Sequence, residues 1–150
     1  MNLSNHFTLQ ELTRTAYMEY QDEPSPEALQ NLKRLCVHFM EPVREVLGCP
    51  IQVSSGYRSL VVNRIVGGVI TSAHRFGRAA DFTPTNVPID EAFDIIRHTD
   101  LQWDQLILEN RGGTRWLHLG IAEEGKEPRR QVMRAVVDSE TGKAHYEKVI

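Results

Sequence analysis

The apolar pattern of this sequence changes its period at Pro50, and this change limits the folds that the chain can adopt. Before Pro50, apolar residues recur with helical spacing over residues 29–47 and form the stripe of an amphipathic helix. After it, short runs such as residues 51–54 alternate in the manner of strands. Helical patterns that precede strand patterns favour an α+β domain, in which helices pack on a small antiparallel sheet.

Local signals place the first helices. Residues 8–11 form a capping box, Thr-x-x-Glu, so a short helix is expected to begin there. Ser25 followed by proline is typical of the first residues of a helix. Gly48 is a plausible stop for that second helix. Pro42 lies inside the stripe and is expected to kink or divide it.

The second half of the chain contains one helical pattern and two pairs of apolar runs, each pair separated by a turn. The helix is expected at residues 88–98, the first pair at 103–109 and 115–121, and the second pair at 131–137 and 143–150. The sequence has no internal repeat and no evident linker. We therefore expect residues 1–150 to form a single domain.

Composition excludes several classes of protein. Seventeen basic and twenty acidic side chains give a net charge of −3, so no nucleic-acid partner is expected. No apolar run has the ~20 residues that cross a bilayer, so no membrane insertion is expected, and no signal peptide is visible. We expect a monomer that is made in the cytoplasm. For Cys36 and Cys49, two buried free thiols are favoured over a disulfide, since no export signal is present.

Two histidines and one aspartate stand out among the titratable residues. Asp81 occupies a position between Ala80 and Phe82 that usually holds a core residue, so a cationic partner is expected, either a metal or an arginine such as Arg58 or Arg78. His74 precedes it by seven residues, and His118 lies within an apolar run, where a lone histidine is usually part of the core. Two imidazoles and one carboxylate would nevertheless suit a catalytic zinc, because three protein ligands leave the fourth position open to water.

A longer motif strengthens the zinc interpretation. It comprises residues 55–59 (Ser-Gly-Tyr-Arg-Ser), Asn63, residues 66–69 (Val-Gly-Gly-Val), residues 72–81 (Ser-x-His-x-x-Gly-x-Ala-x-Asp) and the late Trp-Leu-His at 116–118. Together these segments resemble the zinc D-alanyl-D-alanine carboxypeptidases and the phage and bacterial peptidoglycan peptidases grouped with them. The opening residues 3–8 and the run 104–107 resemble a phage-type branch of this group.

The resemblance implies a D,D-peptidase-like (hedgehog-like) fold and assigns roles to individual residues. His74, Asp81 and His118 are implied as the ligands of one zinc ion. Arg58 is implied to meet a carboxylate or carbonyl oxygen of the substrate. A planar guanidinium suits that role, although a plain salt bridge is the alternative. Ser72 and Tyr57 are implied to contact the substrate.

The implied substrate is a peptidoglycan stem peptide. The reaction would be that of a D,D-carboxypeptidase or of an L-Ala/D-amino-acid endopeptidase, acting on the cell wall after release from the cell. Many relatives carry an acidic general base three residues before the last histidine, where this chain has Arg115. The base must therefore come from elsewhere, or the chain is a non-catalytic zinc-containing module that binds the cell wall or has a structural role in a phage.

Glu109 is the predicted replacement for the missing base. If Glu109 pairs with Trp116 across the hairpin, then Ile107 pairs with His118, and Glu109 points to the same side of the sheet as His118. A shift of one residue in this register would turn Glu109 to the opposite face, where it would pair with an arginine in solvent. Asp104, at the other end of the same strand, is the reserve candidate.

Overall fold

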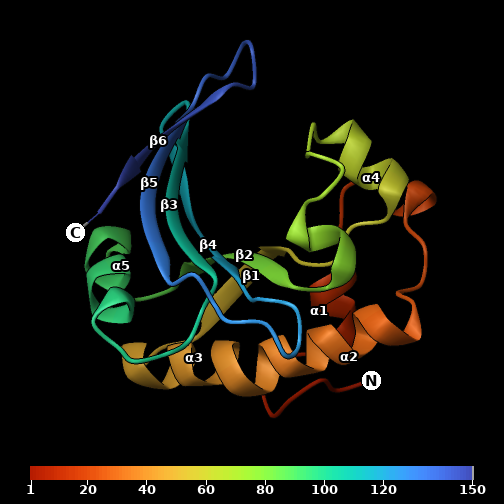
Figure 1. Ribbon diagram of the computed structural model, residues 1–150, viewed down its shortest axis with the longest axis horizontal. Coiled ribbons are helices and arrows are strands. Elements are labelled where there is room, and N and C mark those ends of the chain that lie inside the picture. The colour runs from red at the N-terminus through yellow and green to blue at the C-terminus, as the bar shows by residue number, and fades with distance from the viewer. Residues whose placement is uncertain (150) are drawn as a thin grey trace.

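The computed structural model describes residues 1–149, and it confirms the α+β class (Figure 1). The first half of the chain is mainly helical, with α1 (Leu9–Thr13), the 3-10 turn η1 (Met18–Tyr20), α2 (Pro26–Leu35), η2 (Cys36–Met40) and α3 (Glu41–Leu47). The remaining elements are β1 (Ile51–Ser55), α4 (Leu60–Ile65), η3 (Ala73–Phe76), β2 (Ala79–Pro84), α5 (Ile89–Arg97), β3 (Gln105–Arg111), β4 (Thr114–Gly120), β5 (Gln131–Val137) and β6 (Ala144–Lys148).

The helix signals in the sequence are confirmed. Thr8 caps α1 and forms the predicted capping box with Glu11. Ser25 caps α2, and Gly48 ends α3 in the left-handed conformation. Pro42 divides the long helical stretch as expected. Because proline has no N–H to donate to the preceding turn, the chain widens into one π-helical turn, η2, before α3 continues.

The sheet has six strands in the order β1-β2-β4-β3-β5-β6, and it is mixed rather than antiparallel. The expectation of a purely antiparallel sheet is wrong at one pair, because β5 runs parallel to β3. The connection from β4 to β5 starts and finishes at the same end of the strands, since Gln105 of β3 lies beside both Gly120 and Gln131. β4 runs toward that end and β5 runs away from it, so β5 is parallel to β3.

The β3–β4 hairpin has the register that would place Glu109 beside the histidine. Glu109 pairs with Trp116 and Ile107 pairs with His118, as expected. The loop is shorter than expected, because pairing continues to Arg111 and Thr114. β6 begins at Ala144 and ends at Lys148, and the last predicted strand residue, Ile150, lies outside the described residues.

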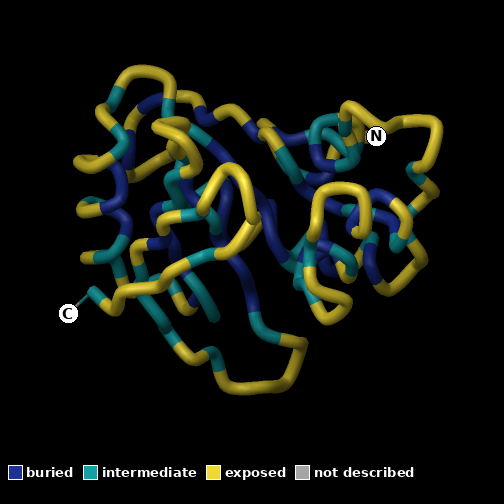
Figure 2. Tube along the Cα trace, turned by 90° about the horizontal axis from the view of Figure 1, so that it is seen from above, coloured by how far each residue is buried: buried dark blue, intermediate teal, exposed yellow. Residues whose placement is uncertain are grey.

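Alternating side chains give the sheet two different faces. The core side chains Leu106, Leu108, Leu117 and Leu119 pack with helices α2, α3 and α5, which cover one face of the sheet. Figure 2 shows buried backbone along the central strands and exposed backbone over the loops. The residues between these leucines, such as Ile107 and His118, therefore lie on the other face, away from α2, α3 and α5.

Cys36 and Cys49 are both free and buried, in agreement with the expected pair of thiols. Burial and the nearby carboxylates of Glu41 and Glu11 raise the pKa of the Cys36 thiol to about 12. This thiol therefore stays protonated at neutral pH. Among residues 1–149, no helix has the length and apolar character that crossing a membrane requires.

Candidate metal centre

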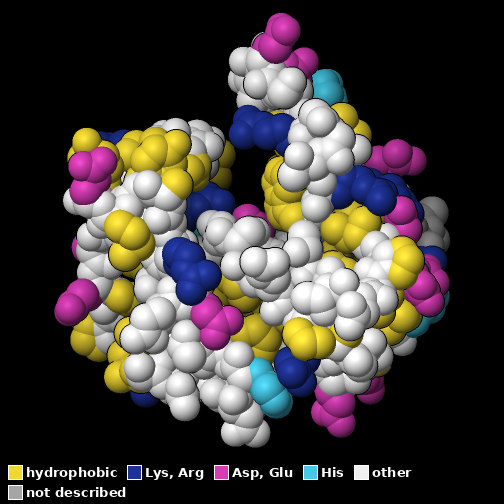
Figure 3. All heavy atoms as spheres, turned by 180° about the vertical axis from the view of Figure 1, so that it is seen from behind, with side chains coloured by type: hydrophobic (Ala, Val, Ile, Leu, Met, Phe, Trp, Pro, Cys, Tyr) yellow, Lys and Arg dark blue, Asp and Glu magenta, His cyan; other side chains and the backbone are white. Residues whose placement is uncertain are grey.

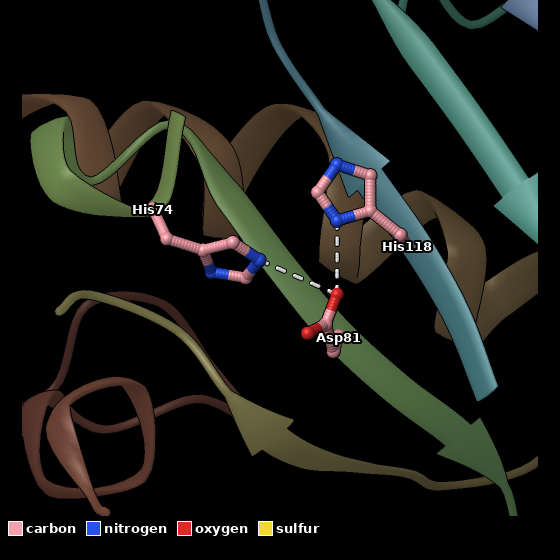
Figure 4. A group of neighbouring side chains, drawn as sticks. All are labelled: His74, Asp81 and His118. Atoms are coloured by element: carbon pink, nitrogen blue, oxygen red, sulfur yellow. Dashed lines mark hydrogen bonds and ion pairs between the residues drawn. The ribbon is translucent and has the colours of Figure 1, made fainter. Parts of the chain in front are cut away.

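His74, Asp81 and His118 converge on one point of the sheet face that lies away from α2, α3 and α5 (Figure 4). Asp81 of β2 and His118 of β4 are direct cross-strand partners, so their side chains lie on the same face. His74 comes from η3, which ends just before β2 begins. The chain turns between η3 and β2 at Gly77, whose φ of 71° is left-handed. A Cβ there would lie 2.4 Å from the carbonyl oxygen of Ala28, so only glycine fits this turn.

The distances within this group fit a tetrahedral metal. Asp81 Oδ1 lies 2.9 Å from His118 Nδ1 and 3.4 Å from His74 Nε2. Bonds of about 2.0–2.2 Å to zinc would place two tetrahedral ligand atoms about 3.3 Å apart. The three ligand atoms all lie within 4.8 Å of one another, and all three residues are largely shielded from solvent. The donor set, two nitrogens and one oxygen, is also one that zinc accepts.

A backbone carbonyl fixes the orientation of His74. The oxygen of Gly56 lies 2.7 Å from His74 Nδ1, so Nδ1 carries the proton and Nε2 is left with a free lone pair toward Asp81. Gly56 can take this position because it has no side chain. A Cβ at this residue would lie 2.3 Å from the carbonyl oxygen of Leu12. The tight contact between this loop and α1 therefore places the carbonyl behind the ligand.

The ionisation states of the three groups also suit a cation. Burial lowers the pKa of His74 and favours the neutral ring that a metal requires. Burial opposes ionisation of Asp81, but the two imidazoles outweigh it and hold the pKa of the carboxyl group well below its usual range. Burial likewise favours a neutral His118, yet the hydrogen bond and charge of Asp81 raise the pKa of that ring. A proton on His118 would therefore compete with a metal ion for this ring.

Arg58 stands next to this group, on the other side of Asp81. Its Nη2 atom lies 3.6 Å from Asp81 Oδ2, while Oδ1 faces the histidines. The guanidinium also donates to Ser55 Oγ and to Asn63 Oδ1, each at 3.2 Å. Asn63 in turn donates to the carbonyl of Val69. The arginine that was the alternative partner for Asp81 is thus present together with the histidines, and its position is held by side-chain hydrogen bonds.

The three residues and Arg58 line a cleft with a volume of about 580 Å³. Glu109 lines the same cleft, as the hairpin register requires. Burial and the negative charge of Asp81 raise the pKa of Glu109, against the opposing effects of His118, the Trp116 indole and Arg58. A carboxyl group with a raised pKa beside the candidate metal site has the property expected of a general base.

The other candidates occupy different positions. Asp104 also lines the cleft, but Arg129 holds it, with Nη2 of the arginine 2.7 Å from Oδ2. The hydrogen bonds from Arg129 lower the pKa of Asp104 despite partial burial, so Asp104 is a poor proton acceptor near neutrality. Arg115 does not line the cleft and pairs instead with Asp90 of α5, at 2.7 Å.

The structure brings Ser72 to the cleft, but it does not bring Tyr57 there. The hydroxyl of Ser72 caps η3 and accepts from the backbone N–H of His74. Tyr57 is buried in the core, where its hydroxyl donates to Asp22. We therefore assign no substrate contact to Tyr57.

Sequence reasoning assigned no role to several residues that shape the site. Asn63 was part of the motif, and its presence there was the available signal that it helps to hold Arg58. The carbonyl of Gly56 gives no signal in a sequence, because every residue has one. Tyr146 lines the cleft from β6, and nothing in its local sequence connects it to a site formed more than twenty-five residues earlier.

Comparison with known protein families gives a match over most of the chain. The sequence model of the family described as Peptidase M15 matches residues 5–119, which include all three candidate ligands, Arg58 and Glu109. A search of curated proteins found no significant match to this chain.

Proposed function

Because the chain belongs to the peptidase M15 family, we propose that it is a zinc-dependent peptidase that hydrolyses a peptide bond in the stem peptides of bacterial peptidoglycan. Members of this family are metal-dependent peptidases, typically with zinc. The observation that carries the proposal is that one cleft holds the His74–Asp81–His118 group together with an acidic and a basic side chain, Glu109 and Arg58. The peptidoglycan substrate rests on the motif over residues 55–81 and its resemblance to peptidoglycan peptidases.

Each residue has a part in the proposed reaction. Zinc, when bound by His74, Asp81 and His118, supplies a Lewis acid that polarises the scissile carbonyl and makes water a nucleophile at neutral pH. Glu109 accepts a proton from the attacking water at a carboxylate oxygen and delivers it to the leaving nitrogen. Arg58 donates hydrogen bonds to the substrate oxygen on which negative charge develops, or to a substrate carboxylate beside it. The Gly56 carbonyl keeps His74 oriented throughout.

The proposed function is tested by incubating the purified, zinc-loaded protein with peptidoglycan fragments and analysing the products by mass spectrometry. We expect either the release of terminal D-alanine or the separation of the stem peptide within its chain, and the product masses identify the bond. An Asp81→Asn variant serves as the inactive control. Absence of any new product after prolonged incubation would contradict the proposal and leave a wall-binding module as the alternative.

Arg58→Lys is expected to reduce turnover without removing the metal. Lysine keeps the positive charge but cannot make two parallel hydrogen bonds to an oxygen pair. Loss of one oxyanion donor typically costs ~10²–10³-fold in kcat, and lysine retains part of the interaction, so a loss of about 10–100-fold is expected. The zinc content should remain that of the unmodified protein.

Arg115→Lys is the matched control for this substitution, because Arg115 is also ion-paired but does not line the cleft. It should leave turnover unchanged. Equal turnover in Arg58→Lys and the unmodified protein would show that Arg58 has only a structural role.

A further inference from the structure

The β5–β6 hairpin forms one wall of the cleft, although it lies beyond the part of the chain that matches the family. The match ends at residue 119, whereas the hairpin spans residues 131–148. Four of its residues line the cleft, namely Val137, Gly142, Ala144 and Tyr146. Figure 1 shows the hairpin rising above the sheet opposite α4, and Figure 3 shows the hollow between these two parts, with basic and acidic side chains inside it. The hairpin side of the cleft thus lies outside the residues that match the family.

Cross-strand pairing joins the hairpin directly to the predicted base. Glu109 of β3 pairs with Trp116 on one side and with Ala135 on the other, and Ala135 pairs with Tyr146. These four residues form one row across β4, β3, β5 and β6, so their side chains share the cleft face. Ala135 is small and buried, while Tyr146 is 58% exposed. The Tyr146 ring therefore extends the cleft wall beyond Glu109.

The next row along the sheet carries a cation. Arg111 pairs with Val137, and Val137 pairs with Ala144, so Arg111 lies on the cleft face below the hairpin. A Cβ at Gly142 would lie 3.4 Å from Nη2 of Arg111, so the guanidinium lies against the hairpin turn. This arrangement places a basic group at the far end of the cleft, two rows beyond the pair formed by Ile107 and His118.

Arg111 differs from the other arginines of the cleft in its partners. Arg58 is ion-paired with Asp81, Arg129 is ion-paired with Asp104, and the guanidinium of Arg78 lies over the ring of Phe76. Arg111 lines the cleft with no carboxylate within ion-pair distance among residues 1–149. It is a bidentate donor that faces the cleft and is available to an external anion.

We propose that Arg111 and the β5–β6 hairpin form a second substrate subsite, in which Arg111 pairs with a carboxylate of the peptide and Tyr146 packs against the peptide chain. The inference rests on the proposed function and adds to it a substrate feature. Arg111 lies four residue steps along β3 from Ile107, which is about 13 Å along a strand. An extended peptide advances at a similar rate, so the recognised carboxylate belongs to a residue two to four positions from the cleaved bond.

The opposite wall suits small apolar side chains on the same peptide. Val66 and Val69 line the cleft from the loop after α4, and both are exposed, Val69 by 68%. Apolar groups on the two walls would pack against the substrate between them and lose contact with water on binding. The subsite therefore takes a peptide that combines alanine-like residues with a free carboxylate.

The test uses stem peptides that are amidated at one carboxyl group at a time. Cleavage by the zinc-loaded protein is followed by mass spectrometry, which gives both the bond and kcat/KM. Amidation of one carboxylate, two to four residues from the cleaved bond, should lower kcat/KM by about tenfold, toward the low end for a charge-assisted hydrogen bond at an accessible site. In Arg111→Gln this difference between the free and amidated peptides should disappear.

Lys143→Gln is the matched control, because Lys143 carries the same charge near the hairpin turn but does not line the cleft. It should retain the tenfold discrimination, which separates a local pairing from a general effect of charge. If the unmodified protein cleaves all the peptides equally, or if Arg111→Gln discriminates as the unmodified protein does, the subsite is wrong and the proposed function stands. If no peptide is cleaved, the proposed function fails and the subsite fails with it.

Discussion

Substitution of Glu109 by glutamine is expected to lower turnover by ~10²–10⁴-fold, the loss typical of removing a general base. Glutamine has nearly the shape of glutamate but cannot accept the proton from the attacking water. Glu109 is not one of the three candidate ligands, so the variant should bind as much zinc as the unmodified protein. Steady-state cleavage of a peptidoglycan stem peptide, together with the zinc content of each protein, measures both effects.

Asp104→Asn is the matched comparison for Glu109→Gln. Asp104 is also a carboxylate of the cleft, but its ion pair with Arg129 lowers its pKa. We expect Asp104→Asn to retain most of the turnover. The reverse result, a near-normal rate in Glu109→Gln and a large loss in Asp104→Asn, would transfer the role of base to Asp104.

Replacement of Asp81 by asparagine is expected to abolish both tight zinc binding and peptide cleavage. The amide preserves the size of the side chain but removes the negative charge that faces both histidines. The loss of zinc affinity should exceed the ~10–100-fold that removal of a group behind a ligand typically costs. Competition with a chromophoric chelator measures the affinity, and the thermal midpoint without zinc shows whether the fold is retained.

Asp94→Asn is the control for this change, because Asp94 lies on the exposed side of α5, away from the cleft. It should leave the zinc affinity unchanged. Zinc should raise the thermal midpoint of the control but not that of Asp81→Asn, since only a ligand that binds the native state stabilises it. An Asp81→Asn variant that binds zinc as tightly as the control would exclude Asp81 as a ligand.

Local sequence patterns predicted much of the secondary structure and the key hairpin. The helix caps at Thr8 and Ser25 and the left-handed stop at Gly48 depend on a few neighbouring residues, so the sequence contains all the information they need. The register of Glu109 against Trp116 follows from a short turn that joins two adjacent strands. Proximity in sequence made these features predictable.

Features that depend on the path of the chain in three dimensions were not predictable. The run at residues 131–137 was recognised as a strand. Its parallel pairing with β3, however, depends on the end of the sheet at which the connection from β4 leads into β5. Tyr57 and Arg58 are adjacent in the motif, yet only Arg58 reaches the cleft, because packing against α1 and the loop before α2 draws Tyr57 into the core. Periodicity gives the faces of an element but not its neighbours.

The candidate site likewise has features that the local sequence predicted and features that it did not. The residue types of His74, Asp81 and His118 and the surrounding motif identified the group that the structure brings together. The capture of Asp104 by Arg129 joins segments twenty-five residues apart, and the contribution of Tyr146 requires that β6 lie two strands from β3. Neither contact can be recognised from the neighbouring residues in the sequence, so neither was predicted.

Cleavage of a stem peptide at increasing zinc content tests the proposed zinc peptidase most directly. The protein is first stripped with a chelator and is then titrated with zinc, while the rate of cleavage is followed by mass spectrometry. We predict no cleavage by the stripped protein and a rate that rises with added zinc to a plateau at about one equivalent per chain, as a site with three protein ligands requires. Undiminished cleavage by the stripped protein, or no cleavage at one equivalent of zinc, would contradict the assignment.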